Sequence, residues 1–279
     1  FTKDFKGLVI HNTIKGVSII KEDENSVIVE LGAGEIWNDI VNWSINEDLY
    51  GIENLSLIPG CVGAAPIQNI GAYGAELKDT FETLDAIHLL TKEKIRLTKS
   101  ECKFGYRNYI FKNEFKNEFI ITKLRLKLSK KTNINLSYQL LKNEANKLNQ
   151  NKITCKDINK LVIKIRTKKL PDPKETGNAG SFFKNPIIAT KHLLEIQKKH
   201  PNVPFFKTNK IKVPAGWLIE QLNWKGYRNQ KCGVHSKQAL VLINHSNATG
   251  KEIQNLANKI KKDVFQEFNI KLEEEVHII

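Results

Sequence analysis

The stretch from Pro59 to Glu76 (PGCVGAAPIQNIGAYGAE) constrains this chain more than any other segment. It holds four glycines and four alanines, and such small residues let a ligand lie against the backbone, where successive N–H groups can cradle phosphate. Gln68, Asn69 and Tyr73 add amide and aromatic groups. The stretch is neither a P-loop nor a GxGxxG fingerprint, so it indicates a nucleotide-like ligand only in general terms. A tight loop that needs small residues for packing explains it equally well.

The length and composition predict a globular protein. At roughly 100–200 residues per domain, 279 residues suggest two domains. Hydrophobic residues make up 41% of the chain and charged residues 27%, which argues against global disorder. No apolar run is long enough to cross a membrane, and the first ten residues (FTKDFKGLVI) do not resemble a signal peptide. We therefore expect a soluble, cytoplasmic protein.

The cysteines and the net charge limit which metals and partners the protein is expected to bind. Cys61, Cys102, Cys155 and Cys232 are widely spaced with no CxxC pair, so we expect neither a metal site nor a disulfide scaffold. The formal net charge of +14 favours anionic partners, either nucleic acid or small phosphorylated ligands. It is also explained by lysine being common throughout a chain rich in Lys, Asn and Ile.

Hydrophobic periodicity predicts an α+β fold, because strands and helices do not alternate strictly. Residues 157–168 form a predicted helix with Asp157 as N-cap, and Thr249 with Glu252 forms a capping box that opens a long helix. The Pro-rich turn Pro171–Pro173 is the candidate domain boundary. The other predicted helices are 36–49, 190–199 and 215–223, and the predicted strands are 27–31, 84–90, 95–97, 119–128, 239–244 and 270–279.

Several segments resemble one known family. The run GIENLSLIPGCVGAAPIQNIGAYGAE (51–76) closely resembles the flavin-binding segment of the bacterial UDP-N-acetylenolpyruvoylglucosamine reductases (MurB). The segment LSYQLL (136–141) makes the chain similar to the longer, type I branch. Further matching segments, in the same order along the chain, are CKFGYRNYIFK (102–112), RTKKLPDPKETGNAGSFFKNP (166–186), AGWLIEQ (215–221), QALVLIN (238–244) and LEEEV (272–276).

The resemblance implies an FAD-binding domain of the vanillyl-alcohol-oxidase/PCMH type and a C-terminal α+β substrate-binding domain. It places the FAD-binding region at 1–168, the substrate domain at 169–269, and a final strand returning to the FAD domain at 270–279. The family's Gly-rich GxGSN-type turn lies upstream of a strand matched by GLVI (7–10), before this chain begins. We therefore expect the Gly/Ala stretch to form about half of the flavin site, with the Gly-rich turn as its partner.

The activity implied by the resemblance is a reduction in peptidoglycan precursor synthesis. The family converts UDP-N-acetyl-3-O-(1-carboxyvinyl)-glucosamine to UDP-N-acetylmuramate, with non-covalent FAD as cofactor and NADPH as co-substrate. The expected partners are therefore the UDP-sugar and NADPH, with no nucleic acid, no membrane and a monomeric state.

Three residues match the family's catalytic positions. Arg107 would stabilise the enolate that develops beside the substrate carboxylate, and Glu275 would assist it. Ser181 would donate a proton to the carbanion; a GxSxG hydrolase elbow is excluded because its flanking positions are Ala179 and Phe183. Read without the family, these three are a surface arginine, a solvated glutamate and a turn serine bonded to nearby backbone.

The remaining predicted contacts follow from the same resemblance. Many relatives have Pro where Glu274 stands and Arg where His277 stands, so the anchoring of the final strand is a departure from the family. Read alone, Tyr138 is an exposed loop tyrosine and Lys169 a solvated lysine. The predicted substrate contacts are Tyr106, Tyr138, Lys169, Asn185 and Gln221, and the predicted cofactor contacts are Pro59, Gly60, Gly63, Ala65, Gln68, Asn69, Gly71, Tyr73 and Gly74.

Two other functions remain open at the level of the sequence. An oxidase of the vanillyl-alcohol-oxidase type would share the fold but would not need Arg107, Ser181 and Glu275 together, and covalent flavin would favour it. A nucleic-acid-binding protein would need a dense basic stripe with interleaved aromatic residues, whereas the lysines here are spread along the chain.

Overall fold

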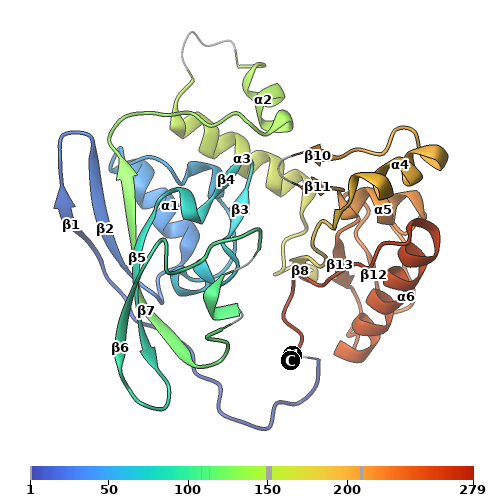
Figure 1. Ribbon diagram of the computed structural model, residues 1–279, viewed down its shortest axis with the longest axis horizontal. Coiled ribbons are helices and arrows are strands. Elements are labelled where there is room, and N and C mark those ends of the chain that lie inside the picture. The colour runs from blue at the N-terminus through green and yellow to red at the C-terminus, as the bar shows by residue number, and fades with distance from the viewer. Residues whose placement is uncertain (1, 108, 113, 149–152, 208–209) are drawn as a thin grey trace. The chain divides into compact units, whose positions relative to one another are not determined.

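The computed structural model describes residues 2–107, 109–112, 114–148, 153–207 and 210–279 (Figure 1). Contacts divide the chain into two compact units, Val9–Arg166 and a second unit that joins Phe1–Leu8 to Thr167–Ile279. Residues 270–279 thus group with the segment that precedes them; the functional division at 168 and 269 stays a prediction. Within the described residues, no helix is long and apolar enough to cross a membrane.

A five-stranded antiparallel sheet, in the order β1-β2-β7-β5-β6, forms the centre of the Val9–Arg166 unit (Figure 1). One of its faces is apolar, because alternate side chains such as Val29 in β2 and Leu126 in β7 are fully buried there. The helix α1 (Trp37–Asn46) adds Trp37 and Ile40 to the same core. The strands are β1 (Val17–Glu22), β2 (Ser26–Gly32), β5 (Phe81–His88), β6 (Lys94–Thr98) and β7 (Phe119–Ser129).

The structure confirms the predicted strands of this unit at 27–31, 95–97 and 119–128 and the helix within 36–49; the strand predicted at 84–90 is present but ends at His88. The sequence analysis missed β1. All six of its side chains are exposed, so this edge strand carries no alternation between buried and polar residues that a sequence pattern could reveal.

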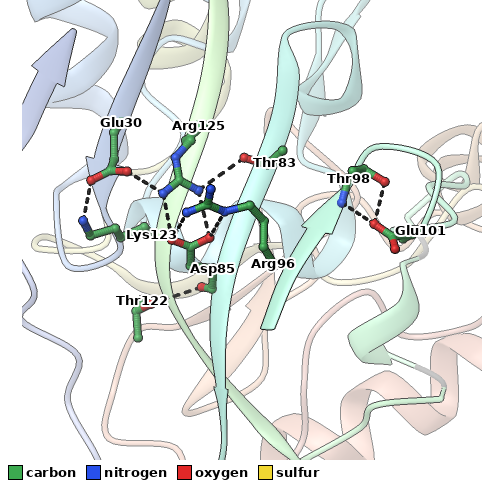
Figure 2. Close-up of polar contacts among 9 residues, drawn as sticks. All are labelled: Glu30, Thr83, Asp85, Arg96, Thr98, Glu101, Thr122, Lys123 and Arg125. Atoms are coloured by element: carbon green, nitrogen blue, oxygen red, sulfur yellow. Dashed lines mark hydrogen bonds and ion pairs between the residues drawn. The ribbon is translucent and has the colours of Figure 1, made fainter. Parts of the chain in front are cut away.

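The other face of the sheet carries a network of charged side chains (Figure 2). Arg125 of β7 is only 6% exposed and donates from both terminal nitrogens to the Asp85 carboxylate of β5, at 2.8 and 2.7 Å. Arg125 also bonds to Glu30 of β2, while Arg96 of β6 donates to Asp85 at 2.7 Å. Arg125, followed by Arg96, holds the pKa of Asp85 well below its usual range. The network therefore links four strands through one buried guanidinium.

Replacing Asp85 by asparagine is expected to destabilise the protein by about 2–3 kcal/mol, because Arg125 would stay buried with only Glu30 as counter-charge. A carboxyl group whose folded-state pKa is lowered contributes its full stability above the unfolded-state pKa. The difference between wild type and D85N should therefore shrink as the pH falls below about 4. Urea unfolding across this pH range measures it.

Glu22→Gln is the matched control for Asp85→Asn. Glu22 pairs with Lys130 on the same sheet but is 58% exposed, so its loss should cost less than about 1 kcal/mol at any pH. Equal effects of the two substitutions would contradict the special role of the buried arginine.

The helices α2 (Gln139–Ala145) and α3 (Cys155–Lys169) bury a small apolar cluster that includes Leu141 and Val162. The predicted helix at 157–168 is confirmed, but Asp157 is not its N-cap. The helix begins at Cys155, and the capping pair is Thr154 with Asp157: Thr154 donates its backbone N–H to Asp157 at 2.9 Å, and the Asp157 N–H returns a bond to the Thr154 hydroxyl at 3.2 Å.

The described residues of the other unit form two small antiparallel sheets and three helices, with the strand orders β10-β11-β9 and β12-β13-β8. The predicted helices at 190–199 and 215–223, the strand within 239–244 and the Thr249–Glu252 capping box are confirmed. The elements are β8 (Gly177–Ser181), β9 (Ile187–Ile188), α4 (Thr190–Lys199), β10 (Phe206–Lys207), β11 (Ile211–Lys212), α5 (Ala215–Gln221), β12 (Cys232–Val234), β13 (Val241–Asn244) and α6 (Gly250–Phe268).

Two strand predictions are wrong. Residues 270–279 form no regular strand; within them Glu274 makes one isolated bridge, to Phe183. Ile270 and Leu272 are buried in the core of their unit, so the alternating pattern reports one-sided burial, which an extended segment achieves without a continuous strand ladder. Residues 7–10 also lack a strand, and their apolar side chains Leu8, Val9 and Ile10 are 83%, 61% and 59% exposed.

Candidate functional site

The Gly/Ala stretch folds into two single turns of helix followed by a short hairpin. Backbone bonds from Val62 to Glu35 and from Gly63 to Ala33, both 2.8 Å, tie its start to the segment after β2. A Cβ atom on Gly63 would lie 2.8 Å from the Ala33 Cβ, so this contact requires glycine. The elements are η2 (Val62–Ala64), η3 (Pro66–Gln68), β3 (Gly71–Ala72), β4 (Ala75–Glu76) and η4 (Leu77–Asp79).

The turn of the hairpin is Tyr73-Gly74, and both residues have positive φ, 50° and 89°. Such values suit the two-residue turns that match the twist of paired strands. Buried Asn54 donates to the Tyr73 carbonyl at 2.8 Å, and Asn135 donates to the Gly74 carbonyl at 3.0 Å. The hairpin is therefore held at its tip by two amide side chains. Predicted cofactor contacts thus lie both on the exposed start of the stretch, at Pro59 and Gly60, and on this anchored turn.

Replacing Gly74 by alanine is expected to destabilise the protein by about 2 kcal/mol or more, because the residue must keep a positive φ and its Cβ would meet Ser137. The Cβ would lie 2.1 Å from the Ser137 Oγ. Gly16→Ala is the matched control, since Gly16 also has a positive φ of 129° but has open space around it. Urea midpoints should fall further for G74A than for G16A, and S137A should recover part of the loss.

The side chain of Arg107 contacts the backbone of the Gly/Ala stretch. Its guanidinium donates to the Gly71 carbonyl at 2.8 Å and to the Asn69 carbonyl at 3.4 Å. A Cβ on Gly71 would come within 3.0 Å of the Arg107 Nη1 atom, so glycine leaves room for this docking. Arg107 itself has a φ of 50°, in the left-handed region. The predicted catalytic arginine and the predicted cofactor segment are therefore in direct contact within one unit.

Aromatic packing holds the loop that carries Arg107. Tyr109 is fully buried and stacks on Phe104 at 4.9 Å and on Phe111 at 5.2 Å between ring centroids. Phe104 in turn packs edge-on against Phe81, the first residue of β5. Residues before and after Arg107 are thus fixed to the sheet, which leaves the arginine few positions to adopt.

Ser181 and Glu275 belong to the other unit, where the backbone brings their segments together. Ser181 is the last residue of β8 and pairs with Val241 of β13. The Glu275 N–H donates to the carbonyl of Phe182 at 2.8 Å, directly after Ser181. The predicted proton donor and the predicted assisting carboxylate therefore lie on adjacent extended segments.

The predicted substrate contacts are distributed over both units. Tyr138, at the start of α2, packs edge-on against Tyr73 with 5.2 Å between ring centroids, while Tyr106 precedes Arg107. In the other unit, the Asn185 side chain accepts from the Ala215 N–H at 2.9 Å, at the beginning of α5. Gln221 is exposed at the end of α5, and Lys169 ends α3. Asn185 therefore has a structural bond, and its contact with substrate stays a prediction.

Comparison with known proteins identifies the family. Residues 2–94 match the family model described as "FAD binding domain", and residues 172–279 match "UDP-N-acetylenolpyruvoylglucosamine reductase, C-terminal domain". A UDP-N-acetylenolpyruvoylglucosamine reductase of Flavobacterium johnsoniae is 52% identical over 281 residues, which cover 100% of this chain and 83% of the relative. The chain belongs to the UDP-N-acetylenolpyruvoylglucosamine reductase family.

Other reductases of this family extend the match. Those of Amoebophilus asiaticus and Chromobacterium violaceum are 44% and 41% identical, each over 100% of this chain and over 83% and 82% of their own lengths. The crystal structure of the reductase from Thermus caldophilus has a TM-score of 0.62 at 24% identity, covering 89% of this chain and 71% of that protein. At that identity the likeness shows the fold alone, and it supports the predicted α+β architecture.

The chemistry of the described residues fits the FAD of this reductase family. Gly60 has a φ of 110°, and an added Cβ would meet no atom within 4 Å, so the backbone there is open to a close-lying ligand. The buried Nε of Arg166 in α3 has no hydrogen-bond partner among the described residues, and burial lowers the pKa of this guanidinium. The ionisable group that acts on it is Tyr73, on the hairpin turn, whose own pKa is raised by burial, so that the phenol is neutral. A buried cation that forms no ion pair within the described part of the chain suits an anionic ligand such as FAD or a UDP-sugar.

Sequence reasoning did not single out Arg166. A signal for it exists: the chain has only five arginines, at 96, 107, 125, 166 and 228, and lysine supplies nearly all other positive charge. Where a buried or forked contact is needed, lysine cannot replace arginine. In this reductase Arg107, Arg125 and Arg166 all have buried or internally bonded guanidinium groups, which distinguishes them from the many solvated lysines.

Proposed function

We propose that this protein reduces UDP-N-acetyl-3-O-(1-carboxyvinyl)-glucosamine to UDP-N-acetylmuramate, with non-covalent FAD as cofactor and NADPH as co-substrate. The observation that carries the proposal is the docking of the Arg107 guanidinium on Gly71 and Asn69 of the Gly/Ala stretch. A fixed cation joined to a flavin-type segment suits a reaction in which negative charge develops on a carboxylate-bearing substrate.

The Gly/Ala stretch would hold FAD, with the open backbone at Gly60 and the anchored hairpin at Tyr73 and Gly74 as its contact surface. When bound, FAD supplies the transfer of two electrons from NADPH to the vinyl ether. Non-covalent binding is proposed because backbone and amide contacts suffice for such a cradle.

The protein residues provide charge and one proton. Arg107 orients the substrate carboxylate and stabilises the enolate, since its guanidinium is already fixed before the reaction. The Ser181 Oγ–H gives its proton to the carbon beside that carboxylate, forming a C–H bond as the O–H bond breaks. Glu275, beside the Ser181 segment, assists enolate stabilisation.

The predicted ligand contacts include basic and polar residues of each unit. We propose that Lys169 neutralises the diphosphate, that Tyr138 closes over the substrate, and that Tyr106, Asn185 and Gln221 contact it. The net charge of +14 favours the approach of polyanionic substrates. The corresponding expectation is that the protein is monomeric and cytoplasmic.

A visible spectrum of the purified protein mixed with FAD tests the proposal. Bound flavin should bleach on addition of NADPH without air, and the enolpyruvyl substrate should restore the oxidised spectrum. NADPH oxidation should continue only while that substrate remains. Flavin that cannot be removed by denaturation, or turnover with oxygen but not with the substrate, would instead indicate an oxidase of the same fold.

A further inference from the structure

Asn69 joins the Gly/Ala stretch to the loop that carries Arg107. It is fully buried, with a left-handed φ of 43°. Its side-chain Nδ2 donates to the Gly105 carbonyl at 3.3 Å, and its backbone carbonyl accepts from the Arg107 Nη1 at 3.4 Å. These two contacts span 36 and 38 residues of sequence, so they connect segments that are distant along the chain.

The side-chain amide of Asn69 makes further hydrogen bonds within the protein. Nδ2 donates to Glu76 Oε2 at 2.9 Å, and Oδ1 accepts the backbone N–H of Lys78 at 3.0 Å. Glu76 is held in turn by Lys78, whose ammonium group lies 2.6 Å away. Both ends of the amide are therefore bonded to protein groups, and the side chain is fixed from the hairpin and from the arginine loop.

Few residues could replace asparagine at this position. A left-handed backbone favours Gly, Asn or Asp. Glycine has no side chain, and aspartate offers no N–H donor for the Gly105 carbonyl and would place a second carboxylate beside Glu76. Asparagine alone among the three satisfies the backbone, the Lys78 donor and the two acceptors at Gly105 and Glu76.

We propose that Asn69 is a positioning residue for Arg107: it fixes the arginine loop on the Gly/Ala stretch, so that the guanidinium keeps one location relative to the flavin segment. This inference rests on the proposed function, in which Arg107 acts on the substrate carboxylate. It assigns the Asn69 side chain to the coupling between two parts of the site and not to the direct flavin contact predicted from the sequence.

Asn69→Asp and Asn69→Gly test this role in the FAD-loaded protein. Both should slow the reoxidation of reduced flavin by the enolpyruvyl substrate by roughly 10- to 100-fold, since a displaced catalytic group loses its orientation. The loss should appear in kcat more than in KM. The affinity for FAD and the rate of flavin reduction by NADPH should not change, because Arg107 acts only on the enolpyruvyl group.

A readout independent of catalysis is hydrogen exchange in the FAD-free protein. Peptides covering residues 104–107 should exchange faster in both variants than in the wild type, while peptides of β7 should not. In the Asn69→Asp background, the Glu76→Gln substitution lets the glutamine amide donate to the new carboxylate at position 69, which restores a hydrogen bond between positions 69 and 76. The Gly105 carbonyl still lacks its donor. The slow reoxidation should therefore persist in the double variant.

Asn247→Asp is the matched control, since Asn247 also has a left-handed φ, 53°, but is exposed in the loop before α6. It should leave both half-reactions unchanged. The proposal is overturned if the Asn69 variants react normally, or if FAD affinity and both half-reactions fall together, which is the result of a purely structural role. Failure of the wild-type protein to turn over the substrate would contradict the proposed function instead, and exchange at 104–107 would still test the link.

Discussion

Replacing Arg107 by lysine is expected to lower kcat by about 10²–10³-fold, the cost of losing one fixed donor to a developing oxyanion. Lysine keeps the positive charge but not the planar fork that bonds to Gly71 and Asn69 together. Its ammonium group would therefore be less fixed when the enolate forms. Single-turnover measurement of flavin reoxidation by the substrate reports this step directly.

The design of the Arg107 experiment separates charge from geometry. Arg107→Ala should be slower still, because both charge and fork are lost. Arg96→Lys is the control: Arg96 is 61% exposed on the sheet, and its substitution should leave turnover unchanged. If R107K keeps normal kcat but loses stability, the arginine serves only to hold the hairpin, and the proposed mechanism is wrong.

Replacing Ser181 by alanine is expected to lower turnover by about 10²–10⁴-fold, the usual contribution of a positioned proton donor. Flavin reduction by NADPH should continue at the wild-type rate, because it does not need this proton. In deuterated water the wild type should incorporate deuterium at the carbon beside the carboxylate. Cysteine at position 181 should restore part of the activity, since a thiol can also donate a proton.

Ser246→Ala is the control for Ser181→Ala, since Ser246 is exposed in the same unit and should tolerate the change. Normal turnover by S181A would show that another group supplies the proton. Loss of flavin reduction together with reoxidation would show that Ser181 affects the site as a whole, which contradicts a specific role in protonation.

The local elements could be predicted where one face of an element is buried. The period-2 pattern of β7 and the capping box of α6 are local properties, and the structure confirms both. The same reasoning failed at β1, whose side chains are all exposed, and at 270–279, where one-sided burial occurs without a ladder. A hydrophobic pattern indicates which side chains are buried. It indicates strand pairing only where the buried segment is also paired with another strand.

The sequence by itself determined the family and predicted the residue types of the site, because the Gly/Ala stretch and the Arg107, Ser181 and Glu275 motifs are contiguous and specific. Tertiary structure alone decided their partners. The bond from Arg107 to Gly71 and the bond from Asn69 to Gly105 join residues that are tens of positions apart, and burial of the Arg166 Nε likewise arises only in the folded chain. Such contacts depend on distance in space and on burial, and neither is a property of a short sequence window.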